Sequence, residues 1–165
     1  MNTKIDLYIR NVIFGMTDSL VSTVGLLAGI DISGTSPHLI VTTGIIYALV
    51  EGFSMAVGSF LSEQSVEEYD SKKQVGISNS ITGALVMFMA FVLASFIPLL
   101  PYVYFGLSSA LWFSVAFSIV ALFIVGMISA KLSNVSILKN GLTMAILGAS
   151  AIVIGVLVGK FMKVG

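Results

Sequence analysis

Cysteine is absent from this 165-residue sequence, and histidine occurs once, at His38. Without cysteine the chain cannot form disulfides, thiolate metal sites or iron–sulfur clusters. With one histidine it cannot supply the helical His pair of a metalloprotease. Charge is also scarce, since Asp, Glu, Lys and Arg make up 10% of the residues, against about 25% in soluble domains. The formal net charge is zero, so no basic surface indicates nucleic acid as a partner.

Apolar residues dominate the sequence, at 57% of the chain with a mean hydropathy of +1.06. This composition predicts an all-α membrane protein with a single transmembrane domain over residues 1–165, surrounded by the lipid bilayer. Five spans are expected, at approximately residues 8–30, 39–70, 77–99, 104–130 and 140–162. Pro98 and Pro101 are expected to end the third span, because proline interrupts a helix.

The second span, residues 39–70, is too long for the bilayer. As a helix it measures about 48 Å, whereas the hydrocarbon layer is about 30 Å thick, so its acidic end should project into water. Most Lys and Arg fall on the N-terminal side of the spans, at Lys4, Arg10, Lys72, Lys73, Lys131 and Lys139. This bias predicts a cytoplasmic N-terminus and an external C-terminus. Lys160 and Lys163 are exceptions, because they lie on the side predicted to be external. Compact loops and the lack of a transit peptide favour a prokaryotic plasma membrane.

Two carboxylates lie near the middle of predicted spans. Asp18 is about ten residues into the first span, and Glu51 is about twelve residues into the second, counted from the opposite side. A carboxylate near the bilayer centre costs about 2.5–3.5 kcal/mol and by default marks a functional site. The two groups could share a proton or chelate a divalent cation. Alternatively, Asp18 stays protonated and bonds to Ser or Thr as a packing device, or the two side chains face different directions.

A spacing of four residues continues from Glu51 along one stripe of the second helix, through Met55, Ser59, Glu63 and Glu67. A thioether is a soft ligand that Mg²⁺ and Ca²⁺ do not use, so a site of carboxylate, hydroxyl and thioether suits Fe²⁺ and tolerates Mn²⁺. The predicted path for metal ions and protons is lined by Asp18, Glu51, Met55 and Ser59. The alternative for Met55 is an ordinary core position, since the chain has eight methionines.

The cytoplasmic end of the second span carries Glu63, Glu67 and Glu68, followed by Asp70. Such a cluster can act as an electrostatic funnel that gathers cations. A solvated helix end has the same composition, so both interpretations stay open for this cytoplasmic metal-capture site.

Small residues recur at intervals of four and seven in the first and last spans, and such faces let helices approach closely. The glycines predicted to serve helix packing are Gly15, Gly25, Gly29, Gly58, Gly148 and Gly155.

Two motifs resemble those of the vacuolar iron transporter family. Residues 17–23 read T-D-S-L-V-S-T, where the family pattern resembles N-D-G-L-V-S-T, and residues 54–62 read S-M-A-V-G-S-F-L-S, where it resembles S-M-A-x-G-E-Y-V-S. The five-span layout with a long second helix is also similar. The resemblance implies a homodimer with an ion path between first and second helices. It also implies export of cytoplasmic Fe²⁺ or Mn²⁺ by proton exchange, with metal or proton roles for Asp18 and Met55. The metal is then a substrate, and no cofactor is expected.

The chain departs from the family pattern at Ser59, which replaces Glu, and at Thr17, which replaces Asn. Plant members have a Glu-rich metal-binding domain where only a few residues separate the second and third spans here. In this short form, the acidic end of the second span is expected to substitute in part for that domain. The alternative is a non-transporting membrane protein that acts as an oligomerisation or partner-binding scaffold. An enzyme is not expected, because Asp18 is the only Asp at membrane depth and an intramembrane aspartyl protease needs two.

Overall fold

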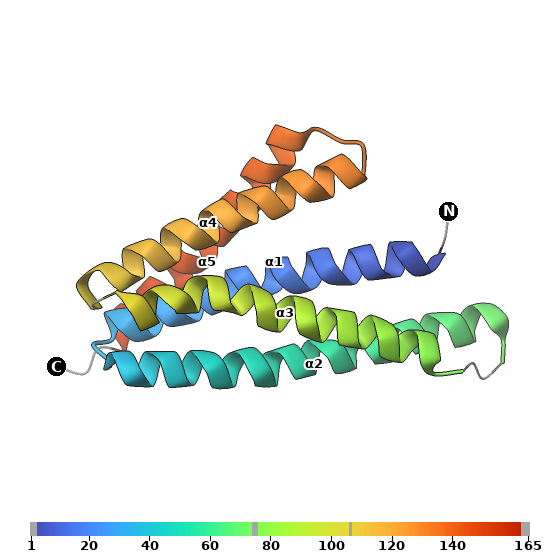
Figure 1. The fold of residues 1–165 in the computed structure, drawn as a ribbon, viewed down its shortest axis with the longest axis horizontal. Helices are drawn as coiled ribbons and strands as arrows, with labels where there is room; N and C mark the ends of the chain where they lie inside the picture. The colour runs from blue at the N-terminus through green and yellow to red at the C-terminus, as the bar shows by residue number, and fades with distance from the viewer. Residues whose placement is uncertain (1–2, 74–75, 106, 163–165) are drawn as a thin grey trace.

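The computed structural model describes residues 3–73, 76–105 and 107–162, and these form a bundle of α-helices. The helices are α1 (Thr3–Ile32), α2 (Pro37–Ser71), α3 (Ser78–Tyr104), α4 (Leu107–Leu132) and α5 (Ile137–Phe161). Each contains a stretch that is long and apolar enough to cross a membrane, which confirms the prediction of an all-α membrane protein with five spans. The chain runs back and forth along the bundle, so its two ends lie at opposite ends of the molecule (Figure 1).

α1 is the central helix. It packs against all four other helices, whereas α2 contacts mainly α3 and, less closely, α1 (Figure 1). Leu20 and Leu27 of α1 are fully buried, and each belongs to an apolar cluster. Leu20 packs with residues of α3 and α4, and Leu27 packs with Ile40 of α2 near the loop between α1 and α2. The core therefore surrounds α1 along most of its length.

Buried polar side chains of α1 bond to the backbone of α3. Asn11, which is 2% exposed, donates from Nδ2 to the Gly83 carbonyl oxygen at 2.9 Å. The buried Ser19 hydroxyl donates to the Phe91 carbonyl oxygen at 2.7 Å. An unpaired polar group inside a bilayer is costly, so these bonds stabilise the packing. They also fix the rotation of α1 about its axis, and thereby decide which of its residues face α2.

α2 is the longest helix, at 35 residues. It measures about 52 Å, which exceeds the hydrocarbon thickness of about 30 Å, and it extends past the N-terminal end of α1 (Figure 1). The helix ends at Ser71 because Lys72 adopts the left-handed conformation, with a φ of 55°. Its last turns carry the acidic residues, beyond the apolar part of the bundle.

The prediction that Pro98 and Pro101 end the third span is wrong, because α3 continues through both prolines to Tyr104. A proline in a membrane helix removes one backbone hydrogen bond, and neighbouring helices and hydroxyl side chains can compensate. Both prolines are buried, and the Ser114 hydroxyl of α4 donates to the Pro98 carbonyl oxygen at 2.8 Å. Packing against α4 therefore maintains the helix where the sequence pattern indicates a stop.

Candidate functional site

A row of polar side chains follows the contact between α1 and α2, and we call it the polar seam. It contains three pairs in which a residue of α1 faces one of α2: Ser22 and Tyr47, Asp18 and Glu51, and Arg10 and Glu63. Two further residues of α2, Met55 and Ser59, lie between Glu51 and Glu63. Because the two helices run antiparallel, later residues of α1 face earlier residues of α2. Neighbouring positions on each helix are one or two turns apart, which keeps them on one face.

Asp18 and Glu51 are brought together in the middle of the seam. Asp18 lies halfway along the apolar stretch Ile5–Ile32, both side chains are partly buried, and they are close enough to interact electrostatically. Within the described residues neither forms an ion pair, and the salt bridge found there joins Arg10 to Glu63. Two adjacent carboxylates without a counter-charge repel each other in a medium of low dielectric. A proton or a bound cation would relieve this repulsion.

An open cavity of about 540 Å³ leads towards the two carboxylates from the N-terminal end of α1. It is lined by residues of α1, α2 and α3: Arg10, Asn11, Phe14, Ser54, Met55, Gly58, Ser59, Ser62 and Met87. Phe14 lies one turn before Asp18, and Met55 lies one turn after Glu51, so the cavity ends about one helical turn from the carboxylates. Met55 and Ser59, both singled out in the sequence, therefore line this cavity.

Tyr47 belongs to the seam but was missed by the sequence pattern. Its side chain lies near that of Ser22, whose hydroxyl donates to the Asp18 carbonyl oxygen at 2.6 Å. The Tyr47 ring also packs against the Phe91 ring of α3, with centroids 6.4 Å apart. Tyr47 precedes Glu51 by four residues, so it continues the four-residue stripe of Glu51, Met55 and Ser59 towards the N-terminus of α2. The same spacing could therefore have found this residue.

The acidic end of α2 is partly neutralised. Glu63, whose side chain is 17% exposed, accepts a hydrogen bond of 2.6 Å from the Arg10 guanidinium, which is 64% exposed. The Gln64 amide donates to a Glu68 carboxylate oxygen at 3.3 Å, and Glu67 is partly buried. In the described part of the chain, no group of three or more His, Cys, Asp or Glu side chains could hold a metal ion. Among the described residues, the acidic end thus offers a charged surface and no such metal site.

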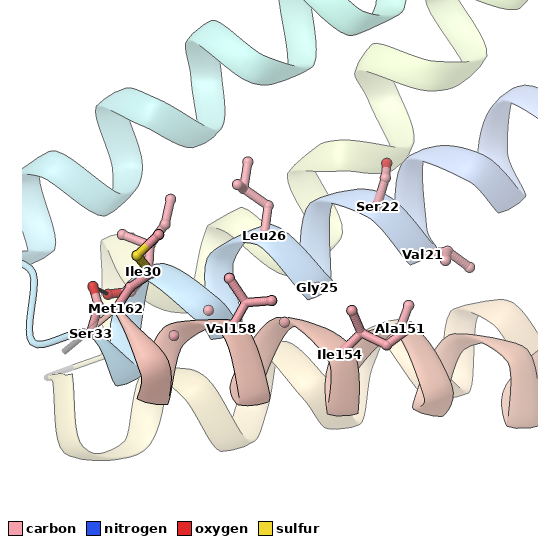
Figure 2. Close-up of a pocket in the computed structure, with 13 residues that line it drawn as sticks. Val21, Ser22, Gly25, Leu26, Ile30, Ser33, Ala151, Ile154, Val158 and Met162 are labelled. Carbon is pink, nitrogen blue, oxygen red and sulfur yellow. Dashed lines mark hydrogen bonds between the residues drawn. The ribbon is translucent and has the colours of Figure 1, made fainter.

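Glycines bring α1 and α5 into backbone contact. A Cβ atom at Gly29 would lie 2.8 Å from the Gly155 carbonyl oxygen, and one at Gly25 would lie 3.1 Å from the Ala151 carbonyl oxygen. Beside these contacts runs an apolar groove of about 440 Å³ between the two helices (Figure 2). Its lining contains no carboxylate or imidazole, so it offers no such ligands to a metal ion.

The other glycines singled out in the sequence have different surroundings. Gly15 lies against Met87 of α3, and Gly148 lies against Leu122 of α4. Gly58 is in open space, because a Cβ atom there would meet no atom within 4 Å, and it lines the cavity of the polar seam. In the described part of the chain, Gly58 therefore makes no close helix contact.

Two comparisons relate the chain to known proteins. An uncharacterised protein of Methanocaldococcus jannaschii is 23% identical over 163 residues, which cover 88% of this chain and 84% of that protein. The sequence profile of the VIT family matches residues 9–75 and 67–160, and its members are transporters, not enzymes. These matches include both motifs and reach from α1 to α5, which confirms the resemblance seen in the sequence. The chain therefore belongs to the VIT family, whose membership indicates metal-ion transport across a membrane.

Proposed function

We propose that the protein is a homodimeric exporter that moves Fe²⁺ or Mn²⁺ out of the cytoplasm in exchange for protons. In each protomer the ion path follows the polar seam. It begins at the acidic end of α2, continues through the cavity past Ser59 and Met55, and reaches Asp18 and Glu51. Protons that arrive from the far side of the membrane then displace the metal ion.

The carboxylate pair at mid-membrane is the observation that carries the proposal. Asp18 and Glu51 interact electrostatically, and among the described residues neither has a cationic side chain as a partner. A divalent cation would neutralise both groups, and so would protonation. Because the pair holds either the metal or protons, the two ligands compete for one site. Competition at a single site is the minimum requirement for exchange.

The ligands available on the seam favour a transition metal. The Met55 thioether lines the route, and a soft sulfur ligand discriminates against Mg²⁺ and Ca²⁺. Two carboxylates and one thioether leave an octahedral shell incomplete, and within the described residues no third acidic or imidazole group joins them. The outer side of α2 is exposed at Val50 and Phe53, next to Glu51. A second copy packed on this side could complete the shell, which supports the homodimer.

The direction of transport follows from the distribution of basic residues. Lys72, Lys73, Lys131 and Lys139 are exposed and lie in or beside the loops at the end of the bundle where the cavity opens. The positive-inside rule assigns this end to the cytoplasm. Glu67 and Glu68 would gather cations at the cavity mouth, while the ion pair between Arg10 and Glu63 limits how tightly they are held.

Reconstitution into proteoliposomes tests this function. With an acidic lumen and the cytoplasmic face outwards, we expect Mn²⁺ or Fe²⁺ uptake that depends on the proton gradient. Asp18→Asn should abolish uptake, whereas Asp70→Asn, which changes an exposed carboxylate at the end of α2, should preserve it. Uptake by Asp18→Asn at the parent rate would show that the site is wrong. Uptake that ignores the gradient would refute proton exchange, and no uptake at all by the intact protein would favour the scaffold.

A further inference from the structure

We propose that the Arg10 guanidinium competes with the metal ion for Glu63 at the entrance of the cavity, which is the end farther from Asp18 and Glu51. An ion then enters the polar seam only by displacing the guanidinium, and this requirement favours divalent over monovalent cations. The inference rests on the proposed function, because it concerns entry of the transported ion. Arg10 acts by positioning, since it occupies the carboxylate without binding the metal ion.

The ion pair between Arg10 and Glu63 spans the entrance of the cavity. Arg10 is the lining residue of α1 that is farthest from Asp18. The lining residue at the corresponding end of α2 is Ser62, which directly precedes Glu63. The pair joins α1 to α2 at a level about 12 Å along α1 from Asp18. An ion that moves along the seam from the acidic end of α2 therefore meets this pair before it reaches the cavity.

The guanidinium neutralises a carboxylate at the start of the proposed ion path. Arg10 Nη2 donates to Glu63 Oε2 at 2.6 Å, and the Glu63 side chain is 17% exposed. Within the described residues Glu63 forms no other ion pair, and the Lys72 ammonium lies over the Tyr69 ring, 4.0 Å from its centroid. Arg10 is therefore the described side chain that balances the charge of Glu63.

The Arg10 side chain can leave Glu63 without any movement of α1. It is 64% exposed, so it can rotate into water, and exposed ion pairs of this kind are weak. The backbone beside it is held in place, because the next residue, Asn11, is 2% exposed and donates to the Gly83 carbonyl oxygen at 2.9 Å. Displacement of the guanidinium therefore requires the rotation of one side chain.

Charge determines which ions displace the guanidinium. A monovalent cation brings the same charge as Arg10, so its exchange for a guanidinium already in place gains no Coulomb energy. A divalent cation brings twice that charge. It also meets a second carboxylate, because Glu67 follows Glu63 by one turn of α2, is partly buried and forms no ion pair within the described residues. The pair therefore acts as a filter that a divalent ion passes more easily than a monovalent one.

Cysteine labelling tests the filter directly, because the native chain contains no cysteine. The reporter is Ser54→Cys, at an exposed position that lines the cavity beyond the ion pair. Its labelling rate in proteoliposomes is measured with a monovalent cationic thiol reagent and with a neutral reagent of similar size. Arg10→Gln should raise the ratio of the cationic to the neutral rate about fivefold, equivalent to about 1 kcal/mol. Arg10→Lys keeps the charge and should leave this ratio close to that of the parent.

Lys72→Gln is the matched control for the loss of one positive charge. Lys72 is exposed and lies about 27 Å along α2 from the reporter, which is well beyond the Debye length of about 8 Å at physiological ionic strength. Its replacement should leave the ratio of labelling rates unchanged. A ratio that is also unchanged in Arg10→Gln would overturn the filter.

Protection by Mn²⁺ separates competition for Glu63 from simple repulsion by Arg10. Mn²⁺ should slow labelling of the reporter at an about fivefold lower concentration in Arg10→Gln than in the parent, because the carboxylate is then free. In a Glu63→Gln background, Arg10→Gln should shift this concentration by less than about twofold, since no carboxylate remains to compete for. Equal shifts in the two backgrounds, or no shift in either, would overturn the competition.

Mn²⁺ uptake in the same vesicles distinguishes this inference from the proposed function. Labelling and its protection by Mn²⁺ need no transport. If the parent takes up no Mn²⁺, the proposed function fails and the labelling still decides the role of Arg10. If the parent transports Mn²⁺ and Arg10→Gln changes neither the ratio of rates nor the protection, the competition alone is refuted.

Discussion

Replacement of Gly155 by Ala should separate α1 from α5. A Cβ atom at Gly155 would lie 2.8 Å from the Gly25 carbonyl carbon and closer still to the Gly25 carbonyl oxygen, whereas ordinary contacts begin at 3.4 Å. Both groups belong to helix backbones, so no side chain can rotate away. The carbonyl carbon alone requires a separation of about 0.6 Å, and the closer carbonyl oxygen requires more. Overpacking of this kind costs about 1–3 kcal/mol, and the better helix propensity of Ala returns up to about 1 kcal/mol. We expect a net loss of about 1–2 kcal/mol in the free energy of unfolding.

Titration with dodecyl sulfate in mixed micelles, followed by circular dichroism, measures this loss. The matched control is Gly58→Ala, since a Cβ atom at Gly58 meets nothing within 4 Å. Gly58→Ala should be neutral or slightly stabilising for the protomer, so the two alanine variants should differ by about 2 kcal/mol. Equal stability of the two variants would show that α1 and α5 are less closely packed than described.

Three further variants test other contacts. A double-mutant cycle with Arg10→Ala and Glu63→Gln should give a coupling of about 0.2–1 kcal/mol, because the guanidinium is 64% exposed; a coupling well above this range would indicate a buried pair. Asn11→Ala should lower the free energy of unfolding by about 1–2 kcal/mol, since it removes the buried bond to the Gly83 carbonyl oxygen, and an unchanged value would contradict that bond. Met55→Leu keeps the volume but removes the thioether, so competition assays should show at least about tenfold weaker discrimination of Fe²⁺ against Mg²⁺; unchanged discrimination would exclude Met55 as a ligand.

The depth of the carboxylate pair could be predicted from the sequence. Two antiparallel spans of similar apolar length share the same bilayer, so residues near the middle of each must lie at one depth. Asp18 and Glu51 meet this condition, and the structure brings them together. The spacing of four in α2 likewise placed Met55 and Ser59 on one side of the helix, and both line the cavity. Hydropathy and helical periodicity are local properties, which explains why they were sufficient for these residues.

Contacts that depend on the rotation of α1 could not be predicted in the same way. Asn11 and Gly29 fix that rotation through contacts with α3 and α5, which come later in the chain. Only after the rotation is fixed does Ser22 face Tyr47, and Arg10 face Glu63. The continuation of α3 through Pro98 depends in the same way on α4. Each of these features depends on a contact with another helix, and the local sequence pattern does not show which helix that is.

Two polar side chains of α1 form hydrogen bonds with α3, which is synthesised much later than α1. Asn11 and Ser19 each bond to a carbonyl oxygen of α3 that lies 72 residues further along the chain. Until α3 is synthesised, the Asn11 amide and the Ser19 hydroxyl lack the acceptors that they have in the folded chain, and lipid hydrocarbon does not replace them. Release of α1 into the bilayer by itself is therefore less favourable than release together with α3. Because α3 precedes α4 and α5 in the chain, the order of synthesis allows α1 and α3 to form these bonds before the last two helices are made.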